Sequence, residues 1–419
     1  MEVDEDDSSS ETSETSTIEH EQEPYFTFKD RARQLALDLF HGHKPEDIVI
    51  ERMDGGSFNR IIGVTVFRPK PQLTTFKRVY RALANCFSKR KTTTVRPSER
   101  YILRIPRQDA STMDYDVTTL LYTAHHVPHP VPTVFAHDMS SDNALGMGYM
   151  LQHRMPGQTL VDLWQTLNFE QRKCAMRRVT EIVLDLHNTT STSAGIISRA
   201  NNSVDITGRI KIEPYPVSGR LASTTNGVQC PLSIPQTTRD HLLGLCKAQR
   251  PVKVADDGTL LFQYIWDDFE SIINTLYEKG FIPDHHIFHL CHLDLQSRNL
   301  LARVVDESTI EITGILDWDS AAFAPKFLSV RAPFFFWTED DAWEEDEADV
   351  YRPLSDPEHI ALKAVYEEVA GPQFSQTSYI PELALARRMY YILKRGLYSG
   401  IQVQFAEDII EEFAKLNIK

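Results

Sequence analysis

Three polar residues set among apolar segments constrain this chain more than any other feature. In the stretch CHLDLQSRNLLARVVDESTIEITGILDWDSA, Asp294 is followed five residues later by Asn299, and Asp317 comes after the length of a β-hairpin. The apolar runs IFHL, NLLARVV and ITGIL are typical of strands, which would fix the polar groups rigidly. The sequence therefore predicts a fold that holds two carboxylates and one amide close together.

This set of side chains suits phosphoryl transfer. Moving a γ-phosphoryl group requires a residue that accepts or orients the acceptor hydroxyl, and it requires hard oxygen ligands for Mg²⁺. We assign the first role to Asp294 and expect Asn299 and Asp317 to hold Mg²⁺ against the phosphates. We expect His292 to brace the loop by hydrogen bonds, and Asp319 either to orient Asp317 or to face solvent.

Much of the acidic excess lies at the N-terminus. The 419 residues are 42% hydrophobic and carry a formal net charge of -15, from 59 acidic and 44 basic residues. Residues 1–24 hold ten of the acids and no base, so the rest is only mildly acidic, which does not favour nucleic-acid binding. We predict a disordered acidic tail over residues 1–25, because its composition is too polar to offset the ordering entropy.

We expect neither export nor a membrane partner. The N-terminus shows no basic segment followed by an apolar run, and no apolar stretch reaches the roughly 20 residues that a membrane span needs. The five cysteines are scattered and lack C-x-x-C spacing, which argues against zinc and against a disulfide framework. A cytoplasmic protein with reduced thiols fits these features.

The pattern of the first part of the chain predicts a small sheet. Strand patterns alternate with a helix near 29–40 and another near 112–124, which predicts a mostly antiparallel sheet over residues 26–154. A basic, polar stretch at about 69–100 interrupts the pattern like a surface insertion. The expected strands lie near residues 47–53, 60–67, 100–106, 130–138 and 147–155.

Helical patterns dominate from residue 155 to 419. Asn168 can cap a helix with Gln171 in the reciprocal position, and a second amphipathic helix ends at Gly280. Further helices are expected near 359–368 and 381–399, whereas residues 191–258 are hard to assign and are expected to be a long irregular stretch or an insert. The fold class is therefore α+β, with a small antiparallel-sheet lobe followed by a larger, mainly helical lobe.

HLDLQSRN followed by ILDWD resembles the H-x-D-x-x-x-x-N and I-D-W-D signatures of the aminoglycoside phosphotransferase and choline kinase-like family. YILRIPR, PVPTVF and the pair Leu186–His187 are also similar to it. The resemblance implies a protein kinase-like bilobal fold, with a nucleotide-binding lobe at 26–154 and a catalytic and substrate-binding lobe at 155–419. It implies an ATP- and Mg²⁺-dependent phosphotransferase that acts on a hydroxyl of a small molecule.

The resemblance also assigns nucleotide contacts. Gly55, Gly56 and Ser57 lie where the family has its phosphate-covering turn, although an ordinary hairpin turn has the same composition. Arg104 lies where kinases place a strand lysine, and its guanidinium suits phosphate. Asp116 lies where the family has a helix glutamate that pairs with this cation; a solvated helix charge is the alternative.

The segment LQHRMPG resembles the hinge that binds adenine, with the backbone groups of Gln152, His153 and Met155 as candidate contacts. Protein kinases typically have Lys and Arg where this chain has Gln296 and Leu293, so we favour a small-molecule alcohol over a protein acceptor. The alternatives are an inactive pseudokinase that binds nucleotide as an interaction module, and an atypical protein kinase.

Two segments suggest an acceptor with a positive charge. The aromatic run FFFW at 334–337 could wall a cation site, and the acidic stretch TEDDAWEEDEAD at 338–349 could attract an amine. Packing in the core and a solvated loop are the alternative interpretations of these two segments.

Overall fold

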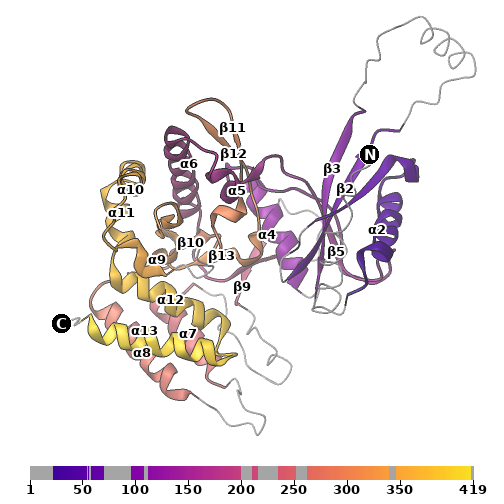
Figure 1. Cartoon of the computed structure of the whole chain (residues 1–419). Helices are drawn as coiled ribbons and strands as arrows, with labels where there is room; N and C mark the ends of the chain where they lie inside the picture. Colours follow the sequence, from indigo (N-terminus) through magenta and orange to yellow (C-terminus); the bar gives the residue numbers. More distant parts are fainter. Residues whose placement is uncertain are drawn as a thin grey trace, which may run out of the picture. The chain divides into compact units, whose positions relative to one another are not determined.

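A computed structural model describes residues 22–53, 55, 58–69, 96–107, 112–199, 210–215, 235–251, 262–338 and 346–416. The chain divides into a smaller unit, residues 1–117 with 132–154, and a larger unit, residues 118–131 with 155–419. Figure 1 labels their elements. Residues 118–131, expected in the N-terminal lobe, thus group with the larger unit, and helix α4 (Met113–His126) contributes residues to both.

The smaller unit is built on one antiparallel sheet with the strand order β1-β2-β3-β5-β4. Strand β3 pairs with β2 on one side and with β5 on the other, so its residues lie in the middle of the sheet. Helix α2 (Tyr25–Leu39) packs Phe28 and Leu35 into the same apolar core as Leu103. The strands are β1 (Ile48–Arg52), β2 (Asn59–Phe67), β3 (Ser98–Pro106), β4 (Val134–Asp138) and β5 (Tyr149–His153).

The end of the expected acidic tail is part of the smaller unit. Glu23 forms an ion pair of 2.7 Å with Arg31, and its carbonyl accepts a hydrogen bond of 2.8 Å from Arg60. Tyr25 begins helix α2. The expected tail 1–25 therefore reaches too far at its C-terminal end; residues 1–21, and residues 70–95 of the expected insertion, lie outside the described residues.

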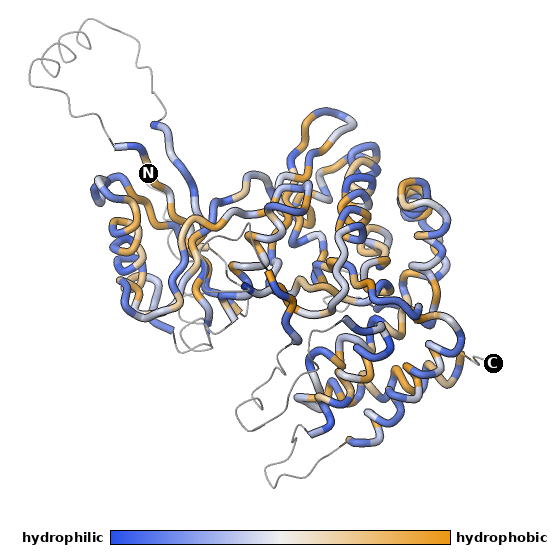
Figure 2. Tube along the Cα trace, turned by 180° about the vertical axis from the view of Figure 1, so that it is seen from behind, coloured by the Kyte–Doolittle hydropathy of each residue, from blue (hydrophilic) through white to orange (hydrophobic). Residues whose placement is uncertain are grey.

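The larger unit is mainly helical. Its helices each bury one apolar face, and Figure 2 shows hydrophobic and hydrophilic residues interleaved along them. Asn168 and Gln171 cap α6 reciprocally, as predicted, with both backbone-to-side-chain bonds at 3.0 Å. In the described part of this unit, the helices of eight or more residues that lie wholly within it are α6 (Phe169–Asn188), α7 (Thr238–Gln249), α8 (Gln263–Glu278), α10 (Pro357–Ala370), α12 (Pro381–Arg395) and α13 (Gly400–Lys415).

The expectation of irregular structure over 191–258 is wrong for part of this segment. Helix α7 lies within it, capped by Thr237, and Leu242 and Leu245 are buried in the core of the larger unit. The short strands β8 (Ile196–Arg199) and β9 (Ile210–Glu213) form a two-stranded sheet in the same segment. The high content of Ser, Thr, Pro and Gly in the segment as a whole obscured this helix.

Two small sheets of the larger unit place the conspicuous polar residues. Strand β10 (Phe288–Cys291) pairs with β13 (Ala322–Ala324) and β7 (Thr190–Ser191). Strands β11 (Leu300–Val304) and β12 (Ile310–Ile315) form the predicted hairpin, with Leu300 opposite Ile315. Strand β6 (Gln158–Thr159) extends that hairpin on its β11 side.

The α+β class is confirmed by a unit built on an antiparallel sheet and a larger, mainly helical unit. This is the bilobal arrangement that the family resemblance implies. Within the described residues, no helix combines the length and the apolar character needed to cross a bilayer.

Candidate functional site

Asp294 and Asn299 lie in the loop between β10 and β11 and contact each other directly. The side-chain amide of Asn299 donates one hydrogen bond to the backbone carbonyl of Asp294, at 2.8 Å, and one to its carboxylate Oδ2, at 2.9 Å. Asn299 is buried at the end of a 3₁₀ turn, Ser297–Asn299. Both amide hydrogens are therefore used to hold Asp294, and only the Oδ1 oxygen of Asn299 is available to another ligand.

Asp317 follows the other strand of the hairpin and is held next to this loop. The backbone N–H of Leu316 donates a hydrogen bond of 2.8 Å to the carbonyl of Asn299. The carbonyl of Leu316 in turn accepts a hydrogen bond of 2.8 Å from Nε2 of His292. Because Leu316 is bonded to both sides of the loop, the chain brings Asp294, Asn299 and Asp317 to the same end of the hairpin.

His292 braces the loop, as predicted. Its side chain is buried, and burial lowers the pKa of His292, so the ring is neutral near pH 7. Since Nε2 donates to a carbonyl, Nε2 carries the proton and Nδ1 is an acceptor. No donor among the described residues reaches Nδ1. The geometry makes His292 a structural link and not the proton acceptor of a reaction.

Backbone strain marks this loop and the turn at Asp317. Three non-glycine residues in the described part of the chain have positive φ, and two of them are Leu293, at 60°, and Asp317, at 61°. Such conformations cost about 1–3 kcal/mol each and persist where the surrounding structure over-determines them, commonly at functional sites. One strained residue therefore directly precedes Asp294, and the other is Asp317 itself.

Two cations near Asp294 were missed from the sequence. Nη2 of Arg298 lies 2.7 Å from the other carboxylate oxygen, Oδ1 of Asp294. Lys394 on α12 donates a hydrogen bond of 3.2 Å to the carbonyl of Ser320, and the charge of Asp294 acts on it. Burial, and then the charge of Arg395, lower the pKa of Lys394 to about 8. The spacing of Arg298 four residues after Asp294 was a usable signal, whereas no sequence signal connects Lys394 to this loop.

The oxygen atoms available at this loop suit a hard cation that also takes phosphate oxygens as ligands. Asn299 offers Oδ1, and Asp317 is an exposed residue that directly follows Leu316, whose backbone is bonded to Asn299. Mg²⁺ commonly takes one or two protein oxygens and completes its shell with water and phosphate oxygens. No group of three or more His, Cys, Asp or Glu side chains within the described residues is arranged for a metal ion. The residues present would therefore fit a Mg²⁺ that takes few protein oxygens, and not an all-protein metal cage.

The glycine turn of the smaller unit needs glycine at one described position. A Cβ atom on Gly55 would lie 2.8 Å from the carbonyl oxygen of Asn59 and 3.1 Å from Nη2 of Arg107. Arg107 is therefore a cation beside this turn that the sequence analysis did not single out. Gly56 and Ser57 lie outside the described residues. Their contact with phosphate stays a prediction.

Arg104 lies in the middle of the sheet of the smaller unit. It stands on β3 between Ile61 of β2 and Met150 of β5 and is buried. Asp116 is half-buried in the first turn of α4. The pairing of Asp116 with Arg104 and the contact of Arg104 with phosphate stay predictions.

Part of the expected adenine-binding backbone is used within the sheet of the smaller unit. The N–H of His153 donates to the carbonyl of Thr133, at 2.9 Å, and the N–H of Arg154 donates to the carbonyl of Arg100, at 2.8 Å. These two donors are not available to a base. Gln152 is buried in β5, and no donor in the described part of the chain reaches its side-chain oxygen. The candidate backbone contacts to adenine therefore narrow to Gln152, to Met155 and to the carbonyl groups of the segment LQHRMPG.

The aromatic run at 334–337 packs in the core. Phe334, Phe336 and Trp337 are buried, and the Phe336 ring packs against Trp164 with ring centroids 5.0 Å apart. Of these four aromatic residues only Phe335 is partly exposed. The packing interpretation of this segment is therefore supported over an exposed wall for a cation.

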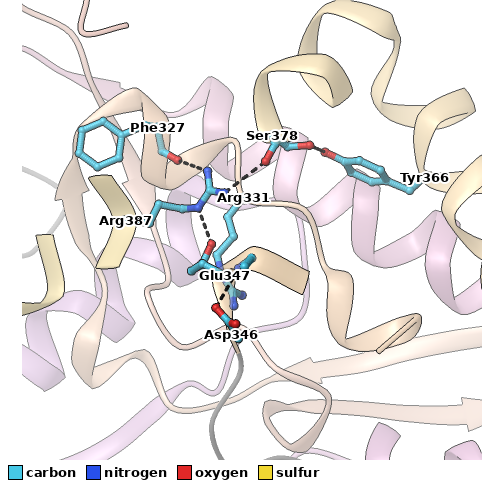
Figure 3. A network of polar contacts seen from close by, with 8 residues as sticks. Phe327, Arg331, Asp346, Glu347, Tyr366, Ser378 and Arg387 are labelled. Carbon is cyan, nitrogen blue, oxygen red and sulfur yellow. Dashed lines mark hydrogen bonds and ion pairs between the residues drawn. The ribbon is translucent and has the colours of Figure 1, made fainter. Parts of the chain in front are cut away.

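Part of the acidic stretch at 338–349 is also internal. The Glu347 carboxylate accepts hydrogen bonds from Nε of Arg331 and from Nε of Arg387, both at 2.5 Å (Figure 3). Burial alone would raise the pKa of Glu347, but the two guanidinium groups outweigh it and hold the pKa below its usual value. Residues 339–345 lie outside the described residues.

The model of the phosphotransferase enzyme family, APH, matches residues 81–326, which is more than half of the chain. The chain belongs to this family. The resemblance seen in the two signatures is thereby confirmed. The matched range includes Arg104 of the smaller unit and Asp294, Asn299 and Asp317 of the larger unit.

Known relatives of this APH chain are distant. Two proteins from strains of Aspergillus fumigatus, both named subtelomeric hrmA-associated cluster proteins, are 21% identical over 286 residues. The match covers 56% of this chain and 55% of each relative, so the chain spans about half the length of the curated relatives it matches.

Solved aminoglycoside phosphotransferases are also similar to this APH chain. The GDP complex of aminoglycoside 2'-phosphotransferase-IIIa is 14% identical, with coverage of 93% of this chain and 99% of that chain and a TM-score of 0.47. A thermostable mutant of APH(4)-Ia in a ternary complex with AMP-PNP and hygromycin B is 16% identical, with coverage of 91% and 97% and a TM-score of 0.46. The nucleotides and the antibiotic are ligands of those proteins.

Proposed function

We propose that the chain is an ATP- and Mg²⁺-dependent phosphotransferase that moves the γ-phosphoryl group to a hydroxyl of a small molecule. The observation that carries this proposal is the joining of Asp294, Asn299 and the Asp317 turn through Leu316, in a member of the phosphotransferase family. Two strained residues in that constellation support a functional role for it.

In the proposed reaction, the acceptor oxygen forms a bond to the γ-phosphorus while the bond from that phosphorus to the β–γ bridging oxygen breaks. Asp294 takes the hydroxyl proton as the new bond forms, and ADP is the leaving group. Asn299 keeps the Asp294 carboxylate oriented through Oδ2, which leaves Oδ1 to face the hydroxyl. Oδ1 of Asn299 and the Asp317 carboxylate would hold Mg²⁺, which neutralises charge on the phosphates when it is bound.

The proposed nucleotide contacts lie in the smaller unit. Arg104 supplies a permanent positive charge for the α- and β-phosphates, with Asp116 as its proposed partner, and the turn at Gly55, Gly56 and Ser57 covers them. The backbone groups of Gln152 on strand β5 are the proposed contact to adenine.

ADP release with and without Mg²⁺ tests the proposal, with Asp294→Asn as the diagnostic variant. Loss of a general base costs about 10²–10⁴-fold in rate, whereas nucleotide binding should persist because Asp294 is not a proposed nucleotide ligand. Asp267→Asn is the matched control, since Asp267 is an exposed partner of Arg250 on another helix. Turnover in Asp294→Asn equal to that of the control variant would rule out the assigned role.

One observation supports a second function, a nucleotide-binding interaction module without turnover. Both carboxylate oxygens of Asp294 are engaged, Oδ2 by Asn299 and Oδ1 by Arg298. If Arg298 never leaves Oδ1, no hydroxyl can replace it. Such a protein would bind ATP with Mg²⁺ and release no ADP, and Arg298→Met would not create turnover.

A further inference from the structure

The described acidic residues of the stretch that suggested a cationic acceptor are neutralised inside the larger unit. Three carboxylates of the stretch 338–349 are described, and each forms an ion pair with an arginine of the same unit. The pairs are Glu347 with Arg331 and Arg387 (Figure 3), and Asp346 and Asp349 with Arg352. Three carboxylates meet three guanidinium groups, so this set presents no net negative charge to an amine.

Two cations lie near the reacting carboxylate itself. Arg298 pairs with Asp294 at 2.7 Å, and Lys394 lies near enough for the charge of Asp294 to act on it. Asp294 thus has two cations near it. The other carboxylates of the site are Asp317, whose charge the proposed Mg²⁺ would neutralise, and Asp319, whose charge acts on His292 of the same loop. Gln296 in the same loop is neutral. A cationic acceptor would have to place its own charge among these cations, which like-charge repulsion disfavours.

Arg298 is placed to exchange one anion for another. Its side chain is 50% exposed, and among the described residues its ion-pair partner is Asp294 alone. Asn299 occupies Oδ2 of Asp294, so Oδ1 is the oxygen left for an acceptor hydroxyl, and Arg298 now holds it. A hydroxyl that binds Oδ1 must displace or share the guanidinium. An anionic group on the acceptor would give Arg298 a new partner at the moment it leaves the first.

We propose that the acceptor carries an anionic group, a phosphate or a carboxylate, close to the hydroxyl that is phosphorylated, and that Arg298 recognises this group. Arginine suits both anions because its planar fork of donors matches two oxygens at once. The inference rests on the proposed phosphotransferase function and adds to it the class of acceptor and the residue that selects it.

The test compares acceptors of different charge in the full chain with ATP and Mg²⁺. Ribose 5-phosphate and gluconate represent the two anionic groups, glycerol and ribose are neutral, and kanamycin and choline are cationic. ADP release gives kcat and KM for each compound. Thermal shift in the presence of AMP-PNP and Mg²⁺ gives binding of the same compounds without turnover.

The variants separate charge from structure. Arg298→Met removes the charge and keeps the length, Arg298→Lys restores the charge, and Arg303→Met is the matched control. Arg303 is an exposed arginine five residues further along, paired with Glu311 at 2.6 Å across the hairpin. We expect Arg298→Met to raise KM for the anionic acceptor by about 10- to 100-fold, the effect of a hydrogen bond between charged groups, with partial rescue in Arg298→Lys and no change in Arg303→Met.

Each other outcome overturns the inference. Turnover of cationic acceptors only would do so. The same holds if neither anionic compound gives a thermal shift or turnover. A KM in Arg298→Met within twofold of wild type would also overturn it. A fall in kcat by the same factor for neutral and anionic acceptors would show that Arg298 only positions Asp294. The proposed function fails separately, by the absence of a shift with ATP and Mg²⁺ and of ADP release with every acceptor.

Discussion

The ion-pair network at Glu347 should stabilise the larger unit by a measurable amount. Glu347 is 12% exposed and lies between the side chain of Arg387, which is 2% exposed, and that of Arg331, which is 24% exposed. Glu347→Gln keeps the size of the side chain but removes its charge. Arg387 would then keep its bonds to the carbonyls of Phe327, at 3.3 Å, and Ser378, at 3.2 Å, but would have no carboxylate partner among the described residues (Figure 3).

Breaking a buried pair by removing one partner costs about 3–5 kcal/mol, because the remaining charge is left uncompensated. One kcal/mol shifts Tm by about 2–4 °C for units of roughly this size, so Glu347→Gln should lower Tm by roughly 10 °C. Differential scanning calorimetry at pH 7 measures this shift. Glu358→Gln is the matched control, since Glu358 is 51% exposed in its pair with Arg172 and such pairs contribute about 0–1 kcal/mol.

The pH dependence gives a second readout of the same network. Because Arg331 and Arg387 hold the pKa of Glu347 below 4.5, its contribution to stability is present above that pH and is lost as pH falls through the lower, folded-state pKa. The difference in Tm between wild type and Glu347→Gln should therefore shrink in acid. A Glu347→Gln protein that loses no more stability at pH 7 than Glu358→Gln would refute the reasoning.

Three further perturbations follow from the described contacts. Burial, and then the charge of His289, lower the pKa of His187 to about 4, so His187→Gln should flatten the fall of Tm between pH 6.5 and 4; an unchanged slope would contradict this. Gly157 has φ of +111° and a Cβ there would lie 2.7 Å from the Ala302 carbonyl oxygen, so Gly157→Ala should cost about 1–3 kcal/mol more in urea unfolding than Gly280→Ala, where φ is +77° and a Cβ would meet nothing within 4 Å. Asn168→Ala should lose about 1 kcal/mol of the α6 cap, measured by thermal unfolding, and Asn168→Ser should recover most of it.

The central hairpin could be predicted because its signals are local. Asp294 and Asn299 are five residues apart, and the strands that follow have clear apolar patterns bounded by polar turns. The cap at Asn168 is equally local, since both partners lie within one turn of helix. Local chemistry of this kind requires no knowledge of the tertiary fold.

The network at Glu347 could not be predicted because its partners are distant in sequence. Arg331 and Arg387 lie 16 and 40 residues from Glu347, and only the packing of α12 brings them together. Composition alone gave an acidic stretch, which could either attract an amine or form a solvated loop. The same reason hides Lys394, which approaches Asp294 from a helix about 100 residues away.

The aromatic run at 334–337 shows the limit of composition in a different way. Four consecutive aromatic residues fit an exposed cation site and a packed core equally well, because exposure depends on which elements cover them. In the structure, Trp337 is buried and packs near Tyr366 of α10, with ring centroids 5.7 Å apart. The burial of this run is a property of the helices around it.

Thermal shift with ATP, with and without Mg²⁺, on wild type and Asp317→Asn tests the central claim most directly. A ligand that binds only the native state at 100 times its Kd adds about 2.7 kcal/mol, which raises Tm by several degrees. We expect a Mg²⁺-dependent rise in wild type that Asp317→Asn loses, while Asp267→Asn keeps it. A rise that is independent of Mg²⁺, or one that survives in Asp317→Asn, would contradict the assignment of Asp317, and no rise at all would contradict the proposed nucleotide-dependent phosphotransferase.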